Sequence, residues 1–112
     1  MKAGGRVVAG TDAPINPYGL SLLAELEHYV AGGLTPLEAM RTATSVSADA
    51  LGLAADLGSI EPRKLADLSF LDGNPLADIK ALRRVKRVMK DGDLFELEAL
   101  LKGPRRQTLP QP

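Results

Sequence analysis

The chain has 112 residues and a mass of 11.9 kDa, with 14 Lys and Arg against 14 Asp and Glu, no Cys and one His. This length excludes two full domains and fits one domain that buries roughly 60–70% of its unfolded surface. The net charge of zero excludes a long-range field that would attract nucleic acid or an anionic membrane. The absence of Cys excludes disulfides, thiolate metal sites and a cysteine nucleophile, and one imidazole cannot build a His-rich metal centre.

No apolar run approaches the roughly 20 residues that a membrane span requires, because Gly, Pro or a charge interrupts each run. The residues after Met1 do not form the apolar segment typical of a secretion signal. We therefore expect a soluble chain without a membrane partner, in a compartment that stays unknown.

The first predicted element is a buried strand over residues 6–10. It is rich in β-branched residues, follows two glycines and ends at Gly10-Thr11-Asp12. The Pro-rich segment 13–19 that follows is predicted to be a loop. A strand that is apolar on both faces normally lies between parallel neighbours, and the later segments of this chain make poor neighbours for it. The pattern therefore indicates that part of the fold lies outside these residues.

Three helices are predicted next. Residues 20–31 place apolar side chains on one stripe with a period of 3.6, namely Leu22, Leu23, Leu26, Tyr29 and Val30. The segment Thr35-Pro36-Leu37-Glu38 is a capping box with Pro at the first helical position, so a second helix begins there. A third, short helix is predicted after a hydroxyl cap within residues 45–47, ending at Gly52.

After Gly58 the pattern of apolar residues changes to a period of two. Residues 66–72, 84–90 and 93–97 are predicted strands, and Asp91-Gly92 between the last two is a strong signal for a two-residue hairpin turn. We expect these strands to form an antiparallel sheet.

Asp12 is the first candidate functional residue. It follows the C-terminal end of a predicted buried strand, which in barrels and open α/β sheets is the edge where active sites are built. Spacing alone favours a turn or helix-cap role, which is common for Asp before a Pro-containing loop. Asn16 and Tyr18 lie in the same loop, where barrel enzymes place substrate contacts, although turn and packing roles fit them equally well.

Two other features have simpler interpretations. His28 lies on the polar face of the first predicted helix, so we interpret it as a surface histidine and not as a ligand. A basic run alternates with apolar residues, as in a strand with one solvated face, and we expect no nucleic-acid partner. Its cations are Arg83, Arg84, Lys86, Arg87 and Lys90.

Several separated motifs follow one another in the chain: Gly10-Thr11-Asp12-Ala13-Pro14, residues 33–40 with Ala43-Thr44, Leu51-Gly52-Leu53, residues 57–68 and residues 71–76. In this order they resemble the C-terminal segment of metal-dependent amidohydrolases of the imidazolonepropionase/prolidase-like branch, over nearly the whole chain up to about Leu101. The resemblance implies an α/β fold that is a fragment of a (β/α)8 TIM barrel. Residues 1–56 would hold the last strand and C-terminal helices of the barrel, residues 57–102 antiparallel strands of a small β-sandwich, and residues 103–112 a flexible tail.

The resemblance also implies a reaction. Asp12 resembles the aspartate that binds the divalent metal, zinc by resemblance, and takes a proton from the water that attacks an amide or cyclic amide C–N bond. A carboxylate oxygen can bind zinc at about 2.0–2.2 Å and accept a proton from water whose pKa the metal has lowered. The other ligands of the family, a His-x-His pair, a Lys or Glu and two further His, are not in this chain.

We therefore expect the chain alone to be inactive. It would be either part of a longer hydrolase that acts on a small-molecule or peptide-like substrate, or an incomplete product that assembles as a homo-oligomer. Its partners would be the rest of the barrel or other copies of itself. The alternative function is a non-catalytic, self-associating assembly domain derived from an amidohydrolase.

Overall fold

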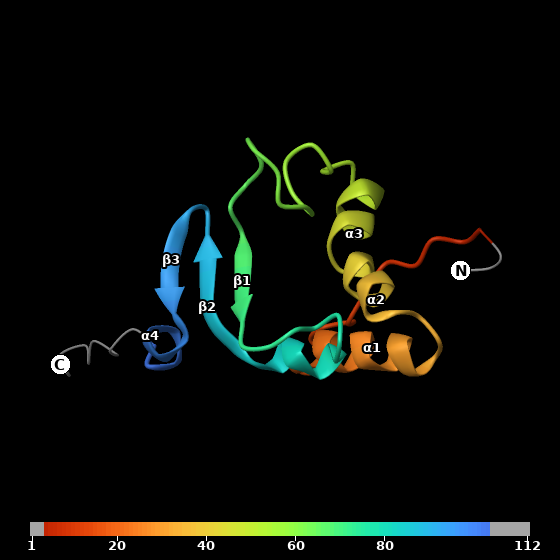
Figure 1. Ribbon diagram of the computed structural model, residues 1–112, viewed down its shortest axis with the longest axis horizontal. Helices are drawn as coiled ribbons and strands as arrows, with labels where there is room; N and C mark the ends of the chain where they lie inside the picture. The colour runs from red at the N-terminus through yellow and green to blue at the C-terminus, as the bar shows by residue number, and fades with distance from the viewer. Residues whose placement is uncertain (1–3, 104–112) are drawn as a thin grey trace, which may run out of the picture.

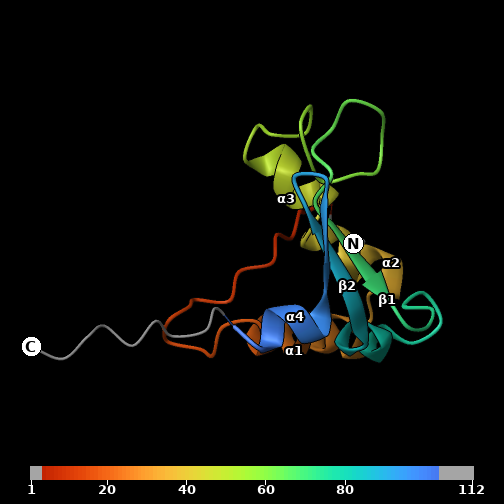
Figure 2. The same ribbon diagram turned by 90° about the vertical axis from the view of Figure 1, so that its left-hand side faces the viewer.

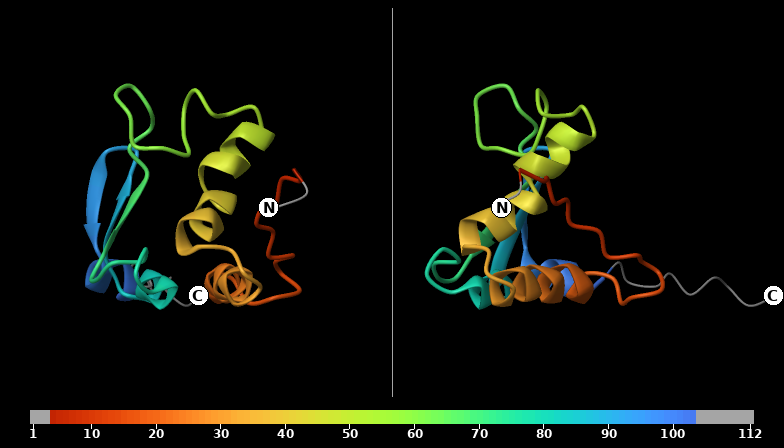
Figure 3. Two further views of the ribbon diagram at one scale, coloured as in Figure 1. Left: turned by 45° about the vertical axis from the view of Figure 1, so that its right-hand side comes forward. Right: turned by 90° about the vertical axis from the view of Figure 1, so that its right-hand side faces the viewer.

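A computed structural model describes residues 4–103 of the chain (Figure 1). The elements in chain order are α1 Leu20–Ala31, α2 Pro36–Thr42, α3 Ser45–Ala50, β1 Leu68–Leu71, the 3-10 helix η1 Ile79–Arg83, β2 Val85–Lys90, β3 Asp93–Glu96 and α4 Leu97–Leu101. Helices α1 to α3 form one group, and the sheet lies beside them (Figures 1 and 3). Most of the predicted tail, from residue 104 onward, lies outside the described residues.

The core forms where α1, α2 and η1 meet. Leu26 of α1, Ala39 of α2 and Ile79 of η1 are buried and pack in one cluster. The apolar stripe predicted for residues 20–31 supplies Leu22, Tyr29 and Val30 to the edge of this cluster. The core of the described residues is small: three of its five buried hydrophobic residues are alanines, and two of those lie outside this cluster.

The capping box predicted at the start of α2 is confirmed. The Glu38 amide donates to the Thr35 hydroxyl at 3.2 Å, and the Thr35 amide donates to Glu38 Oε2 at 2.7 Å. The second of these bonds, with help from the Thr35 hydroxyl, lowers the pKa of Glu38 below its usual value.

The hydroxyl cap predicted within residues 45–47 is wrong: the N-cap residue lies one position earlier, and its hydroxyl does not cap the helix. Helix α3 begins at Ser45, and the side chain of its N-cap residue, Thr44, makes no capping bond. The hydroxyls serve α2 instead: Thr44 donates to the Met40 carbonyl at 2.9 Å, and Ser47 donates to the Thr42 carbonyl at 2.5 Å. Because α3 follows α2 almost directly, the carbonyls at the end of α2 lie within reach of these hydroxyls, which compete with the backbone for them.

The strand predicted over residues 6–10 is not formed within the described part of the chain. Residues 4–10 run as an extended segment that pairs with no strand of residues 4–103, on the far side of α2 and α3 from the sheet (Figures 2 and 3). The Ala9 amide donates to the Thr42 carbonyl at 3.1 Å, which is a contact to a helix end and not to a strand. A strand needs a neighbour for its backbone, and β1 to β3 are occupied with one another.

The antiparallel sheet and its hairpin are confirmed. The strand order is β1-β2-β3, and Lys90 pairs with Asp93 across a two-residue turn. Asp91 and Gly92 have φ of 51° and 87°, the positive values that a type I′ hairpin turn requires. All three strands are shorter than predicted, and β3 ends at Glu96 because the chain turns into α4 at Leu97. Neither α4 nor η1 is predicted by the apolar pattern.

Asp67, just before β1, fastens the hairpin turn to the sheet. Its carboxylate accepts from Lys90 Nζ at 2.5 Å and from the Asp91 amide at 2.7 Å. The hydrogen bond from Lys90 is the main cause, and the bond from the Asp91 amide the second, that lowers the pKa of Asp67 below its usual value.

None of the helices within residues 4–103 combines the length and the apolar composition that a membrane-spanning helix needs.

The capping box predicts the cost of losing one hydroxyl. Thr35→Ala leaves the Glu38 amide without its partner, and we expect the free energy of unfolding in urea to fall by about 1 kcal/mol. Thr44→Ala is the matched control at the N-cap of α3, where no capping bond exists, and should cost less. Equal losses in the two variants would contradict the importance of the box.

The contacts of Asp67 predict a pH dependence. A carboxylate whose pKa is lower in the folded chain stabilises it above the unfolded pKa of about 3.9, and this contribution is lost as the pH falls through the folded pKa. Urea denaturation from about pH 6 to about pH 2 should therefore show a shallower acid loss for Asp67→Asn than for the unmodified chain. Asp56→Asn, whose side chain is unbonded within residues 4–103, is the control. Identical profiles for all three chains would contradict this account.

Candidate functional site

Asp12 lies in an exposed turn directly after the extended segment. Its backbone carbonyl accepts from the amides of Ile15 at 2.9 Å and Asn16 at 3.4 Å, so the chain turns back on itself at this residue. Its φ of 49° is in the left-handed region, which Asp tolerates better than most residues. Within residues 4–103 its carboxylate accepts no hydrogen bond, and the N-cap of α1 is Gly19. The side chain is therefore not a helix cap in the described structure.

The two predicted substrate contacts lie differently. The Asn16 amide group donates to the Thr11 carbonyl at 3.0 Å and thereby closes the turn around Asp12. Tyr18 is 76% exposed and lies outside the hollow beside the turn. Asn16 thus has the turn role that its position in the sequence allowed, and a substrate contact by either residue stays a prediction.

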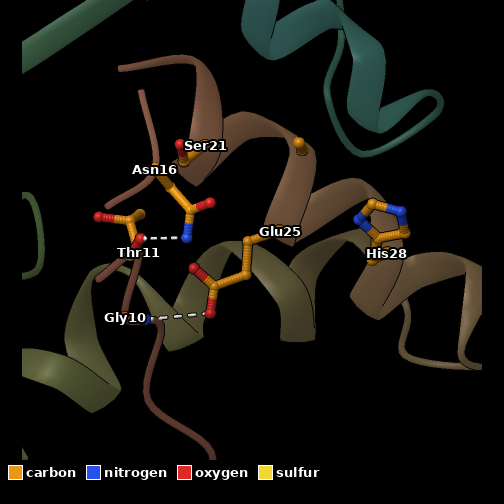
Figure 4. Close-up of a pocket in the computed structure, with 7 residues that line it drawn as sticks. Gly10, Thr11, Asn16, Ser21, Glu25 and His28 are labelled. Carbon is orange, nitrogen blue, oxygen red and sulfur yellow. Dashed lines mark hydrogen bonds between the residues drawn. The ribbon is translucent and has the colours of Figure 1, made fainter. Parts of the chain in front are cut away.

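A hollow of about 410 Å³ lies between the turn and one face of α1 (Figure 4). Backbone and side chains of the turn form one wall, and α1 forms the other. The lining residues are Gly10, Thr11, Asn16, Ser21, Ala24, Glu25 and His28. His28 is exposed and lies further along α1 than Glu25, in agreement with its interpretation as a surface residue.

Glu25 is the residue of this hollow that the sequence analysis missed. Glu25 is not one of the residues of the apolar stripe, yet in the structure it is half-buried and faces the extended segment (Figure 4). Its Oε1 accepts from the Gly10 amide at 3.0 Å and from the Tyr29 hydroxyl, whereas its Oε2 is buried without a partner in the described part of the chain. The spacing of Glu25 and Tyr29, four residues apart on a helix, is the signal that could have indicated this pair.

The contact with Glu25 also changes Tyr29. The hydrogen bond to the carboxylate, with burial as a second cause, raises the pKa of the Tyr29 phenol to about 12. Tyr29 therefore stays protonated and remains a donor to Glu25 at any physiological pH. The bond fixes one oxygen of Glu25 in place beside the Gly10 amide.

The residues present do not form a metal site by themselves. Within residues 4–103, no three His, Asp or Glu side chains lie close enough to hold a metal ion together. Asp12 offers one carboxylate that is free of hydrogen bonds, which is a suitable single ligand for zinc. A complete site would need its other ligands from residues outside the described chain.

The basic run along β2 is largely neutralised. Ion pairs join Arg83 to Glu27 at 2.6 Å, Lys86 to Asp72 at 3.3 Å, Arg87 to Glu96 at 2.7 Å and Lys90 to Asp67 at 2.5 Å. Because four of its five cations have acidic partners, the run supplies little unpaired charge for phosphates. This arrangement fits the interpretation as the solvated surface of a strand.

Comparisons with known proteins cover most of the chain. It is 40% identical to ochratoxinase from Aspergillus niger over 101 residues, which are 86% of this chain and 20% of the relative. A solved Xaa-Pro dipeptidase with bound methionine matches 85% of this chain and 23% of its own, at 39% identity and a TM-score of 0.79. Molinate hydrolase matches the whole chain and 28% of its own, at 30% identity and a TM-score of 0.80.

All three similar proteins match most of this chain, and in each the match covers only a small part of the longer relative. The chain spans about a fifth of the length of the curated relative and about a quarter of the two solved proteins. A sequence profile of the amidohydrolase family matches residues 1–95. The chain belongs to the amidohydrolase family.

Proposed function

We propose that this chain is the C-terminal part of a metal-dependent hydrolase that cleaves amide or cyclic amide C–N bonds. Family membership supports the class of reaction, and the dipeptidase among the similar structures is named for the cleavage of an amide bond. The observation that carries the proposal is Asp12, whose exposed carboxylate lies at the end of an extended apolar segment and is not used by the fold.

In the complete protein, residues 6–10 become the last strand of a (β/α)8 barrel. Three features support this placement: the segment is already extended, Val8 is 43% exposed, and α1 follows through a short loop, as a helix follows a strand in such a barrel. Residues 1–56 then belong to the barrel and residues 57–102 to the β-sandwich. Asp12 lies at the C-terminal end of the strand, where barrel enzymes hold their active sites.

Asp12 has two roles in this proposal. It supplies one oxygen ligand to a divalent metal, zinc by resemblance, and it accepts a proton from the attacking water. A metal bound there would supply Lewis acidity that lowers the pKa of water. Asn16 and Tyr18 would contact a small-molecule or peptide-like substrate from the same loop. The other ligands come from residues outside this chain.

Substitution of Asp12 tests the proposal in the complete protein. Asp12→Asn keeps the size of the side chain but removes the proton acceptor, so kcat should fall on the order of 100-fold or more. Metal content, measured by mass spectrometry, should fall as well. Asp56→Asn, an exposed loop aspartate without side-chain partners in the described structure, should change neither quantity. Unchanged turnover and metal content in Asp12→Asn would remove Asp12 from this role.

A partly apolar face of the sheet, which also carries the Arg87–Glu96 ion pair, favours a second candidate, a non-catalytic domain that associates with copies of itself. Leu68 is paired with Met89 and Met89 with Leu94, so these side chains share one face with Phe70. Phe70 is 41% exposed and Leu94 is 49% exposed. In the complete hydrolase this face would be covered by the remaining strands of the sandwich. In the isolated chain, a second copy offers the same complementary surface.

Light scattering of the isolated chain tests this second candidate. We expect a mass above 11.9 kDa that rises with concentration. The double substitution Phe70→Ser and Leu94→Ser should weaken association at least about tenfold, because it removes large apolar side chains from the contact. Leu76→Ser, at a residue 53% exposed outside the sheet, is the matched control. A well-behaved monomer at every concentration would contradict self-association.

A further inference from the structure

Glu25 forms the side-chain link between α1 and the extended segment that leads to Asp12. Its Oε1 lies 3.0 Å from the Gly10 nitrogen, and Gly10 precedes Asp12 by two residues. The acceptor is a carboxylate, and hydrogen bonds to carboxylates are roughly twice as strong as those between neutral groups. The position at which the segment leaves α2 and enters the turn is therefore tied to one side chain of α1.

The turn itself is closed by local contacts. The Asp12 carbonyl accepts from Ile15 and Asn16, and the Asn16 side chain donates to Thr11. These bonds set the shape of the turn but do not fix it against the rest of the molecule. Three contacts do so on the N-terminal side, from Arg6 to Asp49, from Ala9 to Thr42 and from Gly10 to Glu25, and the last lies nearest to Asp12. Figure 4 shows the Glu25 carboxylate beneath the turn.

The burial of the Glu25 carboxylate carries an unfavourable free energy, and packing alone gives no reason for a charged residue at this position. Oε2 is buried without a donor in the described residues, and an unpaired buried oxygen is unfavourable. An apolar side chain would fill the same space without that cost. The Tyr29 hydroxyl binds the same oxygen that holds Gly10, so the pair is oriented toward the backbone of the segment.

We propose that Glu25 is a positioning residue for Asp12, holding the Gly10 amide so that the Asp12 carboxylate is placed at the mouth of the barrel. The proposal rests on the proposed function, because it assigns Glu25 a task only if Asp12 takes part in the reaction. Glu25 itself does not touch the reacting atoms.

Amide hydrogen exchange in the chain tests the physical link without any metal or substrate. Glu25→Met removes the acceptor but keeps the length of the side chain, and exchange of the Gly10 amide should become about tenfold faster. Glu25→Gln keeps an acceptor oxygen and should restore most of the protection. Glu27→Gln, on the same helix, is the control. Exchange of the core amide of Ala39 reports on global opening and should stay unchanged. Equal Gly10 rates in Glu25→Met and the control would overturn the proposal.

Turnover of the complete protein tests the consequence for Asp12. Glu25→Met should lower kcat about tenfold or more with little change in KM, because a displaced carboxylate impairs the chemical step and not substrate binding. Glu25→Gln should recover part of the loss. If Asp12→Asn lowers kcat but Glu25→Met matches Glu27→Gln, the positioning role is wrong and the proposed function stands. If Asp12→Asn leaves kcat unchanged, both are overturned, even where the Gly10 amide loses protection.

Discussion

The packing of α1 against α2 and η1 is the contact on which the other elements depend. Leu26, Ala39 and Ile79 form its centre, and the capping box at Thr35 fixes where α2 begins. Because α1 is held there, Glu25, one residue before Leu26, is in place to accept from the Gly10 amide. The hydrogen bond from Gly10 to Glu25 is the contact nearest to Asp12 that connects its turn to this core, and a change in the packing of α1 would be transmitted through it to the candidate site.

Local signals predict much of this fold. The interactions that form α1, α2, the capping box and the Asp91-Gly92 hairpin join residues close together in the chain. These elements can therefore be predicted from the local sequence. The strand over residues 6–10 fails for the opposite reason, because a buried strand is stabilised by neighbours that the described residues do not supply. The cap within residues 45–47 fails because the Ser47 hydroxyl donates to the Thr42 carbonyl of α2 instead.

The sequence indicates one residue of the candidate site, Asp12, but not the other, Glu25. Asp12 is found from its place after an apolar run, and the structure leaves its carboxylate free of hydrogen bonds within residues 4–103. Glu25 is missed, since helical periodicity assigns a charged residue off the apolar stripe to solvent and says nothing of a backbone amide that approaches from another segment. The proposed function would account for the exposed side chains of the sheet and for exposed Val8 together, because the rest of a longer hydrolase would cover both.

The central claim is that Asp12 lies beside the metal in the assembled enzyme. A crystal structure of the complete protein, with anomalous scattering recorded at the zinc absorption edge, measures this directly. We expect an Asp12 carboxylate oxygen at about 2.0–2.2 Å from the anomalous peak, with residues 6–10 paired between neighbouring strands. A peak bound entirely by other residues, with the Asp12 carboxylate turned away and hydrogen-bonded to the start of a helix, would contradict it.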